Sequence, residues 1–127
     1  MFGSTLICDD DFTCMNRITR NMSDYYFKNC TFRELEFEGG DFGTVMVFCE
    51  LRNCDLYWST VAAGLFVSTR FVGTAFRGII FAGSKFIECS FVDCNFGKDN
   101  LDGDCDFADA KFIDCEFQNT VGAPAVA

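Results

Sequence analysis

The stretch from Phe71 to Phe96 reads FVGTAFRGIIFAGSKFIECSFVDCNF, and it places phenylalanine at every fifth residue without a break. The same spacing can be followed along the chain in both directions. A period of five fits neither the repeat of an amphipathic helix nor the two-residue alternation of an ordinary strand. The sequence therefore predicts a repeat architecture built from five-residue units.

Nineteen units follow this frame, and 14 of them are centred on Phe. The frame has a step of four between Val47 and Leu51, and a step of six between Leu101 and Phe107. Because bulges in β structure re-aim side chains, both steps predict local defects. The frame residues are Phe27, Phe32, Phe37, Phe42, Val47, Leu51, Leu56, Val61, Phe66, Phe71, Phe76, Phe81, Phe86, Phe91, Phe96, Leu101, Phe107, Phe112 and Phe117.

A second register lies two residues before the large ones, where the side chain is usually small. Its members include Cys30, Cys49, Cys54, Thr69, Thr74, Ser84, Cys89, Cys94, Cys105, Ala110 and Cys115. Residues i and i−2 point to the same side of an extended segment, so each unit offers one large and one small inward side chain. The other positions collect Gly, Asp, Asn and charges, which are typical of turns that face water.

The units Cys89–Asp93 (CSFVD) and Cys94–Lys98 (CNFGK) resemble the A(D/N)LXX units of the pentapeptide-repeat family. The resemblance covers about residues 25–119. It implies an all-β fold, a right-handed quadrilateral parallel β-helix in which four units make one square turn. On that basis we expect a solenoid of a little under five coils.

Four units per coil would sort the large residues into four stacks. The first would hold Phe32, Leu51, Phe71, Phe91 and Phe112, and the second Phe37, Leu56, Phe76, Phe96 and Phe117. The third would hold Phe42, Val61, Phe81 and Leu101, and the fourth Phe27, Val47, Phe66, Phe86 and Phe107.

We expect residues 1–24 to form an N-terminal cap, residues 25–119 the β-helix, and residues 120–127 a flexible C-terminal tail. A cap is expected because a bare terminal coil presents unpaired strand edges. The quinolone-resistance branch of the family dimerises through a C-terminal helix, to which nothing here corresponds. The expected state is a monomer or a weak homodimer through an end coil.

The composition argues against catalysis. Seven of the nine cysteines lie at the inward small position, where a thiol packs as a compact hydrophobe, so we expect reduced thiols and a cytoplasmic location. The chain has no histidine, the commonest general base and zinc ligand. No phosphate loop or nucleophile motif occurs, and no apolar run is long enough to span a membrane. The sequence predicts a non-enzymatic protein with no catalytic residues, cofactor or metal.

The acidic stretch Asp99–Asp106 leaves a calcium loop open as an alternative. Its third position in the EF-hand pattern is Leu101, and no Glu closes the loop. The favoured interpretation is a solvated acidic bulge at the step of six.

Charge is distributed unevenly along the chain, whose formal net charge is −9. Residues 1–29, 30–56, 57–87 and 88–127 sum to −1, −4, +3 and −7, so both ends are acidic and the waist is slightly basic. Such a body repels nucleic acid and anionic membrane and steers towards a basic protein. The candidate acidic binding residues are Glu36, Asp55, Asp93, Asp102, Asp104, Asp106, Asp109, Asp114 and Glu116.

Apolar residues also fall at outward positions and predict a protein-binding surface. One expected stripe on the fourth stack holds Met46, Phe48, Leu65, Val67 and Ile87, and a neighbouring stripe on the first stack holds Val72, Val92 and Ile113. Tyr57 and Trp58 mark a separate corner, as aromatic anchors.

These features lead to a protein-binding function, with three alternatives for the partner. The favoured one is an acidic immunity-type inhibitor that neutralises a bacterial toxin, plausibly a nuclease, by covering its basic surface. The family also includes DNA mimics that bind DNA gyrase or topoisomerase IV and protect it from inhibitors. The acid-free waist and the missing dimerising helix weaken that second hypothesis. A third alternative is a passive module of a larger assembly.

Overall fold

The computed structural model describes residues 5–13, 25–38, 43–98, 101 and 103–124. Within these residues the chain forms short strands joined by tight corners. The strands are β1 (Thr5–Cys8), β2 (Asp11–Phe12), β3 (Tyr25–Lys28), β4 (Thr31–Arg33), β5 (Glu36–Glu38), β6 (Val45–Val47), β7 (Glu50–Arg52), β8 (Asp55–Tyr57), β9 (Leu65–Val67), β10 (Arg70–Val72), β11 (Ala75–Arg77), β12 (Lys85–Ile87), β13 (Ser90–Val92), β14 (Asn95–Gly97), β15 (Lys111–Ile113) and β16 (Glu116–Gln118).

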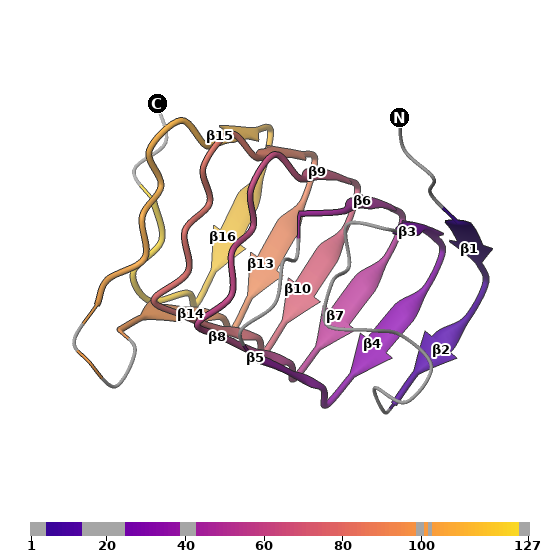
Figure 1. The fold of residues 1–127 in the computed structure, drawn as a ribbon, viewed down its shortest axis with the longest axis horizontal. Coiled ribbons are helices and arrows are strands. Elements are labelled where there is room, and N and C mark those ends of the chain that lie inside the picture. Colours follow the sequence, from indigo (N-terminus) through magenta and orange to yellow (C-terminus); the bar gives the residue numbers. More distant parts are fainter. Residues whose placement is uncertain (1–4, 14–24, 39–42, 99–100, 102, 125–127) are drawn as a thin grey trace.

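The strands stack into three parallel sheets that run along a rod (Figure 1). Sheet A has the order β1-β3-β6-β9-β12-β15, sheet B has β2-β4-β7-β10-β13-β16, and sheet C has β5-β8-β11-β14. The fourth side is marked by bridges from Thr60 to Ile80 and from Ile80 to Asp106. The fold is therefore the predicted four-sided parallel β-helix.

The middle residue of each three-residue strand points inward, because alternate side chains of a strand face opposite sides. Phenylalanine rings stack directly between coils: Phe66 on Phe86 and Phe71 on Phe91 each have ring centroids 4.7 Å apart. Rings on neighbouring sides meet edge-on or tilted, as Phe66 meets Phe71 edge-on at 6.0 Å. The core thus holds stacked phenylalanine rings on both sides of one aliphatic coil, which is made of Met46, Leu51, Leu56 and Val61.

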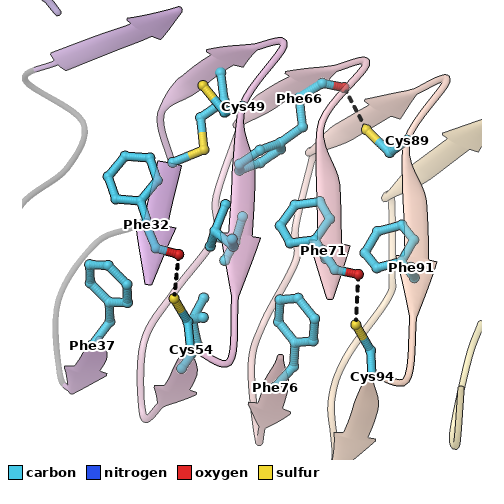
Figure 2. Packing of buried hydrophobic residues seen from close by; sticks show 14 of the residues in the cluster. Phe32, Phe37, Cys49, Cys54, Phe66, Phe71, Phe76, Cys89, Phe91 and Cys94 are labelled. Atoms are coloured by element: carbon cyan, nitrogen blue, oxygen red, sulfur yellow. Dashed lines mark hydrogen bonds between the residues drawn. The ribbon is translucent and has the colours of Figure 1, made fainter. Parts of the chain in front are cut away.

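The small inward residues hold the coils together through side-chain hydrogen bonds (Figure 2). The thiol of Cys89 donates to the carbonyl of Phe66 at 3.2 Å, and that of Cys94 donates to the carbonyl of Phe71 at 3.2 Å. Thr74 makes the same bond with its hydroxyl, to the carbonyl of Leu51. The second register therefore selects a small side chain that can also donate a hydrogen bond to the preceding coil.

The step of four lies upstream of its predicted place. Met46, not Val47, is the inward residue of β6, and it pairs with Phe27 and Phe66. Thr44 is the buried small residue two positions earlier, and its hydroxyl donates to the carbonyl of Tyr25 at 2.6 Å. The shortened step therefore falls between Phe37 and Met46; Phe42 lies outside the described residues.

The step of six shifts the last three phenylalanines by one side relative to the predicted stacks. Leu101 does not continue the third stack, since its side chain is 77% exposed. Phe107 takes that position and stacks on Phe81 at 5.2 Å. As a result Phe112 stacks on Phe86 and Phe117 on Phe91. The coil resumes at Cys105, whose thiol donates to the carbonyl of Phe76, and at Phe107.

The coil extends beyond the expected boundaries at both ends. Strands β1 and β2 add a strand each to sheets A and B, and Phe12 is buried and stacks on Phe32. At the other end Val121 bridges Asn95, and the hydroxyl of Thr120 donates to the carbonyl of Phe91. The segment before residue 25 is therefore part of the solenoid where it is described, and residues 120 and 121 still follow the coil.

Candidate protein-binding surfaces

Most corners in the described part of the chain place one residue in the left-handed backbone region, two positions after an inward residue. Glycine fills this place at Gly73, Gly78 and Gly83, and Asn53 and Asn29 are typical of it too. Phe48 and Trp58 occupy the same conformation with φ of 55° and 54°. A bulky side chain costs about 1–2 kcal/mol in this region. Glu34, Ala63, Ser68 and Glu88 share this conformation, so Phe48 and Trp58 are set apart by their large exposed rings rather than by the φ value alone.

Trp58 belongs to a compact group on sheet C that we call the aromatic corner, made of Asp55, Tyr57, Trp58 and Arg77. The rings of Tyr57 and Trp58 stack at 4.7 Å with planes 16° apart. The guanidinium of Arg77 lies 4.2 Å from the centre of the Tyr57 ring. Trp58 remains 44% exposed. The ring is thus oriented by neighbours while much of it faces water.

Arg77 is fixed in turn by Asp55. Its Nε donates to Oδ1 at 3.1 Å and its Nη2 to Oδ2 at 2.8 Å, a two-point contact that sets the guanidinium plane. These hydrogen bonds raise the pKa of Arg77. Glu36, Phe37, Asp55, Tyr57 and Arg77 line a shallow depression of about 220 Å³ beside the aromatic pair. The structure therefore brings Glu36, Asp55, Tyr57 and Trp58 together on one face. It adds Arg77, whose charge was counted in the sum for residues 57–87 but which was not predicted to be a binding residue.

A second candidate surface is the outer side of sheet A. We call it the apolar face, and its central residues are Val45, Val47, Leu65, Val67, Ile87 and Ile113. Register pairs Val45 with Leu65, and it pairs Val67 with both Val47 and Ile87. Leu65 and Ile87 are half-buried, and Ile113 is 44% exposed. The predicted stripe over Leu65, Val67 and Ile87 is therefore present as a continuous surface.

Two predicted members of the stripes were placed wrongly. Met46 is fully buried, because the step of four turns it inward and leaves Val45 and Val47 outside. Ile113 pairs with Ile87 on sheet A, since the step of six moves β15 to that sheet. Val72 and Val92 pair with each other on sheet B, so the expected neighbouring stripe reduces to these two. Phe48 follows β6 at the corner beside the apolar face and is 60% exposed.

The predicted acids do not form one surface. Glu36 is exposed on sheet C, and Glu116 lies on sheet B, whereas Asp106 is on the fourth side. Asp93 accepts a hydrogen bond from Asn119, and Asp104 lies 3.6 Å from Lys98. Asp109 and Asp114 occupy corners. Asp102 lies outside the described residues.

Other classes of site receive no support from the geometry. Over the described ranges, no group of three or more His, Cys, Asp or Glu side chains is placed to hold a metal ion. The eight cysteines in the described part of the chain are free thiols. No helix in those same segments is long and apolar enough to cross a membrane.

Comparison with known proteins identifies the fold. No protein-family model and no curated protein matches the sequence. Among solved structures, Rfr23, a pentapeptide repeat protein from the cyanobacterium Cyanothece 51142, superposes with a TM-score of 0.67. That alignment covers 93% of this chain and 84% of Rfr23 at 7% identity. Trypsin-treated QnrB1, a plasmid-mediated fluoroquinolone resistance protein, gives a TM-score of 0.40 at 16% identity, over 92% of this chain and 52% of QnrB1, which is too loose to bear on function. The chain therefore has the fold of the pentapeptide-repeat proteins.

Proposed function

We propose that the protein is a non-enzymatic binding module that docks a protein partner at the aromatic corner, and that this partner is a bacterial toxin which the binding neutralises. The observation that carries the proposal is Trp58, which is held exposed in a backbone conformation that glycine would adopt at lower cost. Folding alone does not favour tryptophan there. The stack on Tyr57 offsets part of the cost, and contact of the exposed part of the ring with a partner would add to it.

The composition of the aromatic corner fits such a role. Trp, Tyr and Arg are the residues most enriched among those that dominate binding energy in protein interfaces. Here Tyr57 contacts both Trp58 and Arg77, and Asp55 orients the arginine. Because the rings are already positioned before binding, little side-chain entropy remains to be lost on association.

The charges favour a basic partner. Glu36 is exposed beside the depression, and the net charge of the chain is −9. Asp104, Asp106, Asp109, Asp114 and Glu116 add negative potential near the C-terminal end. Such a field accelerates encounter with a positively charged surface, such as the nucleic-acid site of a nuclease toxin. The free thiols are consistent with action in the cytoplasm.

A tagged pull-down from the native host, with a matched pair of variants, tests the proposal. Trp58→Ala should weaken capture of the partner by about tenfold or more, as expected for a central aromatic anchor. Phe48→Ala is the control, because Phe48 is also an exposed aromatic residue at a corner of the same coil. It should leave capture unchanged.

The identity of the captured protein decides between the partner classes. A stoichiometric basic toxin whose activity is inhibited by the wild-type protein, and less by Trp58→Ala, supports the proposal. Capture of gyrase or topoisomerase IV subunits would favour the DNA-mimic alternative instead. If Trp58→Ala and Phe48→Ala capture every partner equally well, the aromatic corner is not the docking site.

A further inference from the structure

The apolar face of sheet A is not used by the proposed function, and its outward residues form two rows along the rod. The first row holds Leu6, Tyr26, Val45, Leu65, Lys85 and Lys111. The second row holds Cys8, Lys28, Val47, Val67, Ile87 and Ile113. The middle of both rows is apolar over β6 and β9. A continuous apolar surface of this kind usually marks an interface.

Charges border this apolar centre in an asymmetric way. Lys85 and Lys111 lie in the first row, at the start of β12 and β15. Glu88 and Asp114 directly follow the second row, at the corners that end the same two strands. All four side chains are exposed, and none of them forms an ion pair with another described residue. Each of these two coils therefore offers a cation on one edge of the face and an anion on the other.

This arrangement is complementary to itself. Consider two copies facing each other across a two-fold axis that runs parallel to the rod between the two faces. The operation keeps each coil at its own level and brings the first row of one copy opposite the second row of the other. Leu65 then faces Val67 of the second copy. Lys85 comes level with Glu88 of the second copy, and Lys111 with Asp114, and each contact occurs twice.

From this complementarity we infer that the apolar face binds a second copy of the chain, forming a two-fold dimer with its axis parallel to the rod. Six apolar side chains of each copy are removed from water, and four charge pairs close one end of the interface. At the other end the ring of Tyr26 faces Lys28 of the second copy, which suits a cation–π contact. The dimer leaves the aromatic corner of sheet C free, so it goes beyond the proposed function and does not depend on it.

The other face-to-face arrangement lacks this complementarity. A two-fold axis across the rod would reverse the order of the coils and place Lys111 opposite Leu6 and Lys85 opposite Tyr26. No carboxylate would then meet either lysine. Charge therefore selects the axis parallel to the rod.

The size of the face predicts a weak association. Six strands about 4.8 Å apart, each about three residues long, give a face of roughly 25 Å by 12 Å. This is well below the roughly 800 Å² per partner of a stable interface. The dimer should therefore dissociate on dilution, and its formation should respond strongly to single substitutions.

Sedimentation equilibrium of the purified chain, with a reductant to keep the exposed Cys8 thiol from cross-linking, tests the inference. The wild type should show a concentration-dependent dimer. Reversal of both lysines (Lys85→Glu with Lys111→Glu) should raise the dimer dissociation constant by about tenfold, because each substitution acts twice in a symmetric interface. Reversal of both acids (Glu88→Lys with Asp114→Lys) should do the same. The four substitutions together should restore dimerisation to near the wild-type level.

A matched pair of apolar substitutions locates the interface. Val67→Asp should abolish the dimer, whereas Val72→Asp should not, since Val72 holds the same third position in the next strand but lies on sheet B. Circular dichroism checks that both variants keep the β-helix. A wild-type protein that stays monomeric at every concentration, equal effects of the two aspartates, or no rescue in the fourfold charge swap would each overturn the inference. Sedimentation of the purified chain involves no partner protein. Failure to dimerise and failure to capture a toxin are therefore independent results.

Discussion

Phe71 shows how much a single ring contributes to the core. It is buried to 1% exposure, stacks on Phe91 at 4.7 Å, and meets Phe66, Phe76 and Phe86 edge-on or tilted. Phe71→Ala should lower the free energy of unfolding by about 3–5 kcal/mol, because it removes these contacts and leaves a cavity between coils. Urea denaturation measures the loss.

Two further substitutions control for the chemistry of that change. Phe71→Leu should cost clearly less, since Leu51 already fills the equivalent place in the preceding coil. Phe48→Ala, at a 60% exposed ring, should not lower the stability beyond about 0.5 kcal/mol. Similar losses at Phe48 and Phe71 would show that the stack does not carry the stability.

The inward thiols make stability depend on alkaline pH. Burial raises the pKa of Cys49 and of Cys54 to about 11, well above the ordinary value of a thiol. A raised pKa means that the folded state holds the proton more tightly, so stability is complete below pH 9 and declines as the pH rises towards 11. Replacing both with threonine should flatten this decline, because Thr69 and Thr74 hold the equivalent places one coil later. Urea denaturation at pH 8, 9 and 10 compares the slopes, and identical slopes would contradict this account.

The corner is the element in which this sequence departs most from what the backbone favours. Phe48 adopts a φ of 55° with its ring exposed, and no ring stacks on it among the described residues. Phe48→Gly should therefore raise the free energy of unfolding by about 1 kcal/mol. Trp58→Gly should gain less, since it also loses the stack on Tyr57. Thermal unfolding compares the two, and a destabilised Phe48→Gly would show that the ring is held by contacts within the chain.

The five-residue period predicts the short strands and the corners, because only a short extended segment and a tight turn fit such a unit, whereas the square section was implied by the resemblance to the pentapeptide-repeat family. It does not locate the irregular steps, since Met46 and Val47 are both apolar, as is Leu101. The second register resolves both cases. Two residues before Met46 is Thr44, and two residues before Phe107 is Cys105, both of them small donors. Two residues before Leu101 is the charged Asp99. A small donor two positions earlier is therefore a better guide to the inward residue than apolar character alone.

The candidate surfaces were harder to predict than the core. Tyr57 and Trp58 could be recognised as outward aromatic residues, but the contact of Tyr57 with Arg77 joins residues one coil apart. Such contacts depend on register between coils, and an error of one side misplaces every later residue. This is why Ile113 was assigned to the wrong face, although it was correctly expected to be exposed.

The whole molecule is a stack in which each coil contacts only its neighbours, so its stability should vary along the rod. Phe71, Phe76 and Phe86 in the middle are about 1% exposed, whereas Phe112 and Phe117 near the C-terminal end are only half-buried, because fewer coils cover them. Native-state hydrogen exchange should therefore find slow amides in the central coils, such as Ser68 and Ala75, which bond to neighbouring coils at 2.9 Å. The amide of Glu116 makes the same kind of bond at 3.0 Å but should exchange faster, since opening the last coil exposes less apolar surface. Equal protection at the centre and the end would contradict this gradient and show that all coils unfold together.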